Sequence, residues 1–204
     1  KEPIELSLED SHLIGDLNCH IWTEESPMNQ DSIWIFKTNK KSLINTVDSR
    51  VSVSQIKSMK EFIGGDPNLV LMQGSGASWF PVAYTQYNDE KRKNVSIKKK
   101  ESKLNYVLQT ATAFNSEHLV INAGPPAFLD NKIFYANDDP IFPNPQTSKN
   151  WLSNKGYAKT IHATMPGDVL DLETNTLNQN NEIRKNFSWD DYTEYLKNYS
   201  SEME

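Results

Sequence analysis

A chain of 204 residues is long enough to bury a sizeable core, while 37% apolar residues and a formal net charge of −6 describe a polar, acidic protein. Its single cysteine excludes an internal disulfide framework and a zinc site built from several cysteines of the chain. The acidic balance argues against general nucleic-acid binding, and no stretch approaches the roughly 20 apolar residues of a membrane span.

The first third of the chain alternates apolar and polar residues, as half-buried strands do. This alternation predicts strands at 3–9, 17–23, 32–38 and 68–73, with a further short strand near 45–54. Within LNCHIWT (17–23), it places Cys19 with Leu17 and Ile21 on one face and His20 with Trp22 on the other. We take the Cys19 face as the core face. Ile56, Met59, Phe62 and Ile63 follow at helical spacing before Gly64, which predicts a helix over 52–65.

Later segments are also interpreted mainly as strands. The predicted strands are 78–87, 94–100, 104–114, 118–123, 132–137, 157–165 and 168–173, with a turn at NDEK joining the first two. Helical signals return in a short turn at 148–156 and in a C-terminal helix near 188–199, where Ser188 is the expected N-cap. The sequence therefore predicts one domain over 1–204 of the mainly β, α+β class: an antiparallel sandwich or barrel with two or three peripheral helices.

Cys19 beside His20 suggests a nucleophile and its base, but consecutive strand residues point to opposite faces. A basic partner for Cys19 would have to be His118 or His162. The surroundings of Cys19 are not those of a reactive cysteine, and we interpret it as buried and structural. The four histidines show neither HxH nor HExxH spacing, so we predict no metal and no cofactor.

The Gly-Ser loop at 73–78 (QGSGAS) resembles a phosphate-cradling loop but lacks the lysine of GxxxxGK[ST], and the segment after it is predicted as a strand. Ser75 is its candidate nucleophile. A tight connection between two strands explains the loop without a ligand.

The basic segment 91–103 (KRKNVSIKKKESK) carries seven cations and one glutamate. We interpret it as a sheet edge on which exposed Lys98, Lys99 and Lys100 prevent pairing with other chains. The alternative is contact with an anionic surface through the same lysines.

The segment 124–145 holds five of the ten prolines and is long for a loop without regular structure. Phe128, Tyr135, Asp138 and Asp139 are its candidate binding residues, and packing of its aromatic rings onto the sheet is the simpler explanation.

Because no catalytic constellation is visible, we predict a non-enzymatic binding module that contacts a protein or glycan partner. The chain begins with Lys1 rather than Met, which agrees with an exported bacterial protein outside the cytoplasm. Two alternatives stay open: a hydrolase with a site assembled near loop 73–78, and an inhibitor or immunity-type protein whose acidic surface binds a basic partner.

Overall fold

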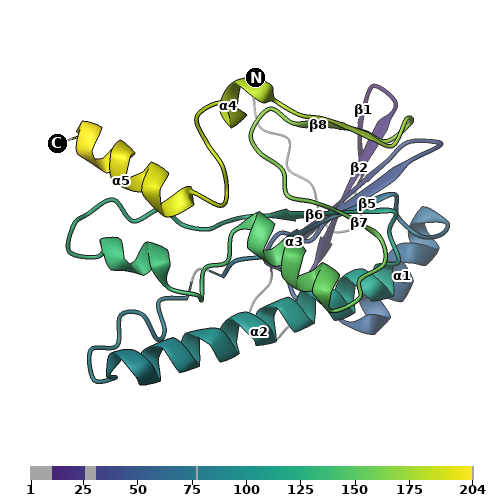
Figure 1. Ribbon diagram of the computed structural model, residues 1–204. Helices are drawn as coiled ribbons and strands as arrows, with labels where there is room; N and C mark the ends of the chain where they lie inside the picture. Colours follow the sequence, from purple (N-terminus) through teal and green to yellow (C-terminus); the bar gives the residue numbers. More distant parts are fainter. Residues whose placement is uncertain (1–10, 26–30, 77, 204) are drawn as a thin grey trace.

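The computed structural model describes residues 11–25, 31–76 and 78–203, and its largest feature is an open seven-stranded sheet (Figure 1). The strands lie side by side in chain order: β1 (Ser11–Ile14), β2 (Leu17–Thr23), β3 (Ser32–Lys37), β4 (Ser42–Asn45), β5 (Leu69–Gln73), β6 (His118–Asn122) and β7 (Thr160–His162). Neighbours from β1 to β4 are antiparallel, and neighbours from β4 to β7 are parallel. Strands β8 (Val169–Asp171) and β9 (Thr176–Asn178) form a separate hairpin.

Each parallel pair needs a crossover, and the crossovers contain α1 (Val53–Ile63), α2 (Asp89–Phe114) and α3 (Pro145–Asn154). These three helices cover one face of the sheet, whereas the β8–β9 hairpin lies on the other side (Figure 1). The chain ends with α4 (Asn181–Arg184) and α5 (Tyr192–Met203), and the short 3-10 helix η1 (Phe134–Asp138) precedes α3.

The main core lies between the sheet and the three helices. Its fully buried members come from both layers and include Ile33, Ile35, Ile44, Met59, Val107, Phe114, Leu119 and Leu152. Local signals fix α1 as predicted: Ser52 and Gln55 form a capping box, and Gly64 ends the helix at φ 88°. The α+β class is thus confirmed, in the form of an open mixed sheet rather than a closed barrel.

The predicted strands at 94–100 and 104–114 are wrong, because both lie in the 26-residue helix α2. Asn88 caps its first turn, which contains Asp89 and Glu90, and its buried residues Leu104, Val107, Ala111 and Phe114 follow at spacings of three and four. The lysines of 91–103 therefore lie along a helix, and the sheet-edge interpretation is wrong as well.

Three further strand predictions differ from the structure. The segment 78–87 forms turns, 132–137 lies mostly in η1, and 45–54 runs from the end of β4 into α1. The predicted strand at 3–9 lies outside the described residues. The strands predicted at 17–23, 32–38, 68–73 and 118–123 are confirmed as β2, β3, β5 and β6, while β7 and β8 are shorter than predicted.

The predicted core face of β2 is also wrong. His20 and Trp22 pair with Ile35 and Ile33 of the main core and contact the ring of Phe62 on α1. Cys19 lies on the opposite face, where it is nevertheless buried.

No helix of the described residues is long and apolar enough to cross a membrane.

Candidate functional site

A cavity of about 170 Å³ lies beyond the carboxyl end of β7. Its walls come from α3, from the segment after β7, from the end of the β8–β9 hairpin, and from residues around α4 and the start of α5; they include Lys149, His162, Met165, Arg184, Trp189 and Asp190. Ligands of open α/β sheets bind outside the carboxyl ends of the parallel strands, which makes this histidine cavity the candidate site.

Two histidines meet beside this cavity. His118 begins β6 and His162 ends β7, and the register of these parallel strands brings both side chains to the sheet face opposite the helices. His118 Nδ1 lies 3.0 Å from His162 Nε2, and His118 Nε2 lies 3.1 Å from Oδ1 of Asn175, in the turn between β8 and β9. Both rings are buried.

These contacts assign the protons of the pair. The Asn175 carbonyl oxygen only accepts, so His118 donates from Nε2 and its Nδ1 accepts from Nε2–H of His162. Neutral His162 then carries a lone pair on Nδ1, and this atom has no hydrogen-bond partner within the described part of the chain. Burial lowers the pKa of His162, as do the nearby His118 and Lys149. Because its pKa is lowered, His162 is an acceptor near neutral pH.

Two donors of the cavity wall are also unused. The indole Nε1–H of Trp189 is buried without a hydrogen-bond partner, and Lys149 forms no ion pair with any residue of the described ranges. Arg184, in contrast, is fully engaged: its two terminal nitrogens donate to the carboxylate of Asp168 at 2.5 and 2.6 Å. Among the described residues that line the cavity, Lys149 is therefore the cation without an ion pair.

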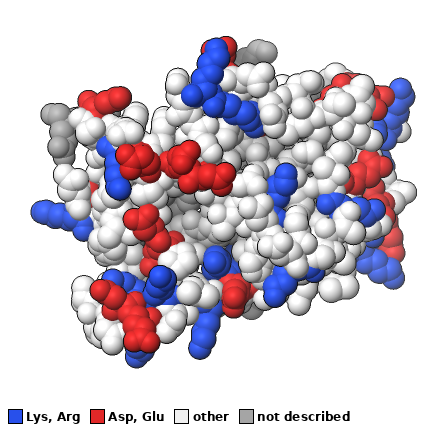
Figure 2. Space-filling view, in the orientation of Figure 1, with Lys and Arg blue, Asp and Glu red and all other residues white. Residues whose placement is uncertain are grey.

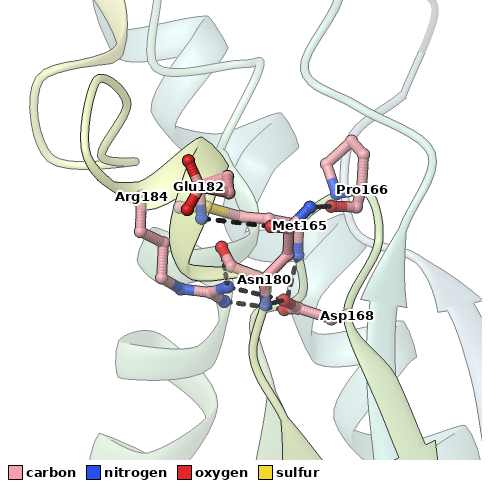
Figure 3. A network of polar contacts seen from close by, with 6 residues as sticks. All are labelled: Met165, Pro166, Asp168, Asn180, Glu182 and Arg184. Carbon is pink, nitrogen blue, oxygen red and sulfur yellow. Dashed lines mark hydrogen bonds and ion pairs between the residues drawn. The ribbon is translucent and has the colours of Figure 1, made fainter.

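Asp168 holds the wall of the cavity in place, as Figure 3 shows. Its side chain is 1% exposed and also accepts from the backbone N–H groups of Met165 and Asn180. These bonds join the loop after β7 to the start of α4. Arg184 is the main reason that the pKa of Asp168 lies far below its ordinary value, and the backbone donors lower it further.

A second, larger hollow of about 540 Å³ adjoins the first and shares Trp189 and Asp190 with it. We call it the acidic groove, since Figure 2 shows acidic side chains around a hollow on this face; those that line it are Asp138, Asp139, Asp190, Asp191 and Glu194. Lys100 of α2 and Lys197 of α5 also line it.

Three of the predicted binding residues therefore lie together, because Asp138, Asp139 and Lys100 all line the acidic groove. Phe128 instead packs in a small core with Val82 and Phe142. Tyr135 is half exposed, and Arg92 lies over its ring.

The neighbouring lysines have other surroundings. Lys98 is exposed on α2, and Lys99 is only partly exposed because it donates to Ser78 Oγ and Phe80 O.

Of the four predicted catalytic candidates, the structure brings together only His118 and His162. Within the part of the chain that the structure describes, Cys19 forms no hydrogen bond with a histidine, although His12 of β1 is its cross-strand partner. Ser75 is buried, and its hydroxyl has no hydrogen-bond partner in the described chain.

Packing explains the glycines around Ser75. A Cβ on Gly74 would lie 2.3 Å from Ile121 Cγ2, and a Cβ on Gly124 would lie 2.5 Å from Ser75 Cβ. The Gly-Ser loop is thus closely packed where it leaves β5, but it leads through turns to α2, so the predicted connection between two strands is wrong.

The sequence did not reveal Asn175, Lys149 or Trp189 as site residues. Asn175 is 57 residues from His118 along the chain, and no local motif surrounds any of the three. The sequence signal at Asn175 was its residue type, because asparagine is common in tight turns and tolerates the positive φ of 55° that it adopts here.

Comparisons with known proteins give similarities in sequence and in structure. No family model matches the chain. A protein of Mycolicibacterium smegmatis named "Putative Rieske 2Fe-2S iron-sulfur protein" is 29% identical over 119 residues, which is 56% of this chain and 23% of that protein. The chain thus spans about a quarter of the relative's length. Among solved structures, a mutant of the CmlA beta-hydroxylase aligns with 78% of this chain and 32% of its own, at 15% identity and a TM-score of 0.45.

The residues of this chain do not fit a Rieske cluster, which is held by two cysteines and two histidines. The chain has one cysteine, and Cys19 on β2 lies four strand spacings, roughly 19 Å, from the histidine pair that starts on β6. Within the described residues, no group of three or more His, Cys, Asp or Glu could hold a metal ion.

The sequence relative overturns the predicted function. The prediction of a binding module that contacts a protein or glycan partner is wrong, because the similarity found by sequence is to a protein named as an iron–sulfur protein. The comparison supports neither the hydrolase nor the inhibitor alternative.

Proposed function

We propose that this chain is the substrate-holding domain of an iron–sulfur-dependent oxidation system and that the cluster lies outside it. The similarity to the mycobacterial iron–sulfur protein carries the proposal. The relative has ample length beyond the matched region for a cluster domain, since 119 residues make up only 23% of it. The single cysteine of this chain agrees with a role that does not include cluster ligation.

The histidine cavity supports the substrate-holding part of the proposal. It is small, lies beyond the carboxyl end of a parallel strand, and combines an unused acceptor with unused donors. Sites for small molecules are concave and contain a few polar groups that fix the orientation of the ligand. In such a division of labour, the cluster would supply electrons and this chain would bind and orient the molecule to be oxidised.

Two measurements test the proposal. First, anaerobic incubation of the purified chain with iron and sulfide should give no electron paramagnetic resonance signal of a reduced [2Fe–2S] cluster. Second, binding of the reduced mycobacterial relative to the purified chain is measured by isothermal titration calorimetry under anaerobic conditions. We expect saturable binding to the relative and none to serum albumin, the control protein. A cluster formed by the chain alone, or no more binding to the relative than to albumin, would refute the proposal.

A further inference from the structure

The histidine cavity contains three polar groups that no part of the described protein uses. One is an acceptor, Nδ1 of His162. The other two are donors: the buried indole N–H of Trp189 and the ammonium group of Lys149. A buried donor without a partner costs about 1–3 kcal/mol of desolvation, so a native protein keeps one where a ligand or water satisfies it.

The volume of the cavity suits a ligand of a few non-hydrogen atoms. One water molecule occupies about 30 Å³ of liquid, so a cavity of about 170 Å³ corresponds to five or six waters. A two- to four-carbon acid fits such a space.

The charged side chains of the cavity wall favour a ligand with a negative charge. Of the cations that the described residues place on the wall, Lys149 has no ion pair, whereas Arg184 is neutralised by Asp168. A carboxylate that approaches Lys149 and the Trp189 indole would accept a charge-assisted hydrogen bond from the first and a neutral one from the second. Asp190 on the same wall disfavours a second negative group on the ligand.

The histidine pair indicates which hydrogen-bonding group the ligand carries beside the carboxylate. Asn175 and His118 fix the tautomer in which His162 turns a lone pair, not an N–H, away from the pair. A lone pair repels a carboxylate oxygen and accepts from a hydroxyl. The group of the ligand at His162 therefore has to carry a hydrogen.

We propose that the histidine cavity binds a small hydroxycarboxylate, whose carboxylate accepts from Lys149 and Trp189 and whose hydroxyl donates to Nδ1 of His162. Asn175 is a positioning residue, because it acts through His118 on the tautomer of His162. This assignment names a substrate class for the proposed function and rests on it, yet it concerns binding alone and involves no iron–sulfur protein.

The test compares glycolate with acetate, which differ by the hydroxyl group alone. Titrations of the ¹⁵N-labelled chain are followed by nuclear magnetic resonance at the indole N–H of Trp189, assigned with Trp189→Phe, and at the imidazole nitrogens of His162. We expect glycolate to shift both signals and to bind at least tenfold more tightly than acetate, because a site built to hydrogen-bond a hydroxyl rejects the analogue without it.

Variants locate the carboxylate and the positioning residue. Lys149→Met should weaken glycolate binding about ten- to hundredfold, the worth of one charge-assisted hydrogen bond. Lys155→Met is the matched control, since it removes the same charge at the end of α3, where Lys155 lies over Trp151 outside the cavity. Asn175→Gly retains a residue suited to φ 55° and should raise the share of the Nδ1–H tautomer of His162 in the free protein.

Three results would overturn the inference: equal affinities for glycolate and acetate, a Trp189 signal that glycolate leaves unmoved, or equal effects of Lys149→Met and Lys155→Met. The first comparison uses the unmodified protein, so it holds even where a variant folds poorly. Because neither acid is present when binding to the mycobacterial relative is measured, failure here leaves the outcome of that measurement unchanged.

Discussion

Replacing Asp168 by asparagine should destabilise the protein strongly without changing the shape of the side chain. The carboxylate accepts four hydrogen bonds, two from Arg184 and one each from the backbone of Met165 and Asn180. The asparagine amide has one acceptor oxygen in place of two, and its NH2 group faces donors that the carboxylate oxygen accepts from in the wild type. Removing one member of a buried ion pair costs about 3–5 kcal/mol.

The expected loss lies at the lower end of this range, about 3 kcal/mol, because the Arg184 side chain is 20% exposed and water recovers part of its charge. For a domain of this length, that loss lowers Tm by roughly 6–12 °C. Urea unfolding followed by circular dichroism gives the free energy, and hydrogen exchange distinguishes global destabilisation from opening of residues 180–187 alone.

The matched control is Asp171→Asn in the same hairpin. Asp171 accepts from the backbone N–H groups of Glu173 and Thr174, a turn that asparagine also makes, so its loss should stay below about 0.5 kcal/mol.

The pH dependence of stability tests the same prediction for Asp168 a second time. The pKa of Asp168 is depressed in the folded state, so its contribution is complete above the unfolded pKa near 4 and is lost as the pH falls below it. The stability difference between the wild type and Asp168→Asn should therefore shrink between about pH 5 and pH 2. Equal losses for Asp168→Asn and Asp171→Asn would refute the reasoning.

Three other predictions concern single sites. Gly74→Ala should lower the free energy of unfolding in urea by about 1–3 kcal/mol, because the new Cβ meets Ile121. Gly76→Ala is the control and should be close to neutral, because the nearest neighbour of its Cβ would lie at 4.0 Å. Equal effects of the two substitutions would show that close packing is not the reason for a glycine at position 74. Asn137→Leu should cost about 2–3 kcal/mol, since the Asn137 side chain bonds the backbone of Phe128 twice and of Phe134 once, and an unchanged denaturation midpoint would contradict this. His162 should titrate below pH 6.5 in a pH series of its imidazole signals, and a higher pKa would exclude it as the neutral acceptor of the cavity.

Sequence patterns within short segments correctly predicted four strands and helix α1. The strands β2, β3, β5 and β6 are short apolar or alternating runs, and α1 has a capping box at one end and a glycine at the other. Helix α2 was missed because Val95 and Ile97 alternate with polar residues over a few positions. Its helical period emerges only from Leu104 onward, in the half that packs on the core.

The candidate site was harder to predict, because the fold assembles it from distant segments. His118 and His162 meet only because β6 and β7 pair in parallel at one register, and Asn175 reaches them from a hairpin on the other side of the sheet. Nothing in the spacing of four histidines encodes that register. The face of Cys19 was predicted wrongly for the same reason, since alternation tells which residues share a face but not which face the helices cover.

Strand order that equals chain order has a consequence for how the protein folds. Within the seven-stranded sheet, each strand from β2 to β7 pairs with the strand before it in the chain. The sheet can therefore grow strand by strand while the chain leaves the ribosome. The longest connection between neighbouring strands of this sheet joins β5 to β6. It spans residues 74–117 and includes α2. Because closing a connection costs more the longer it is, we expect docking of α2 to be the slowest step, so that substitutions on its buried face slow folding more than those in the β1–β4 meander.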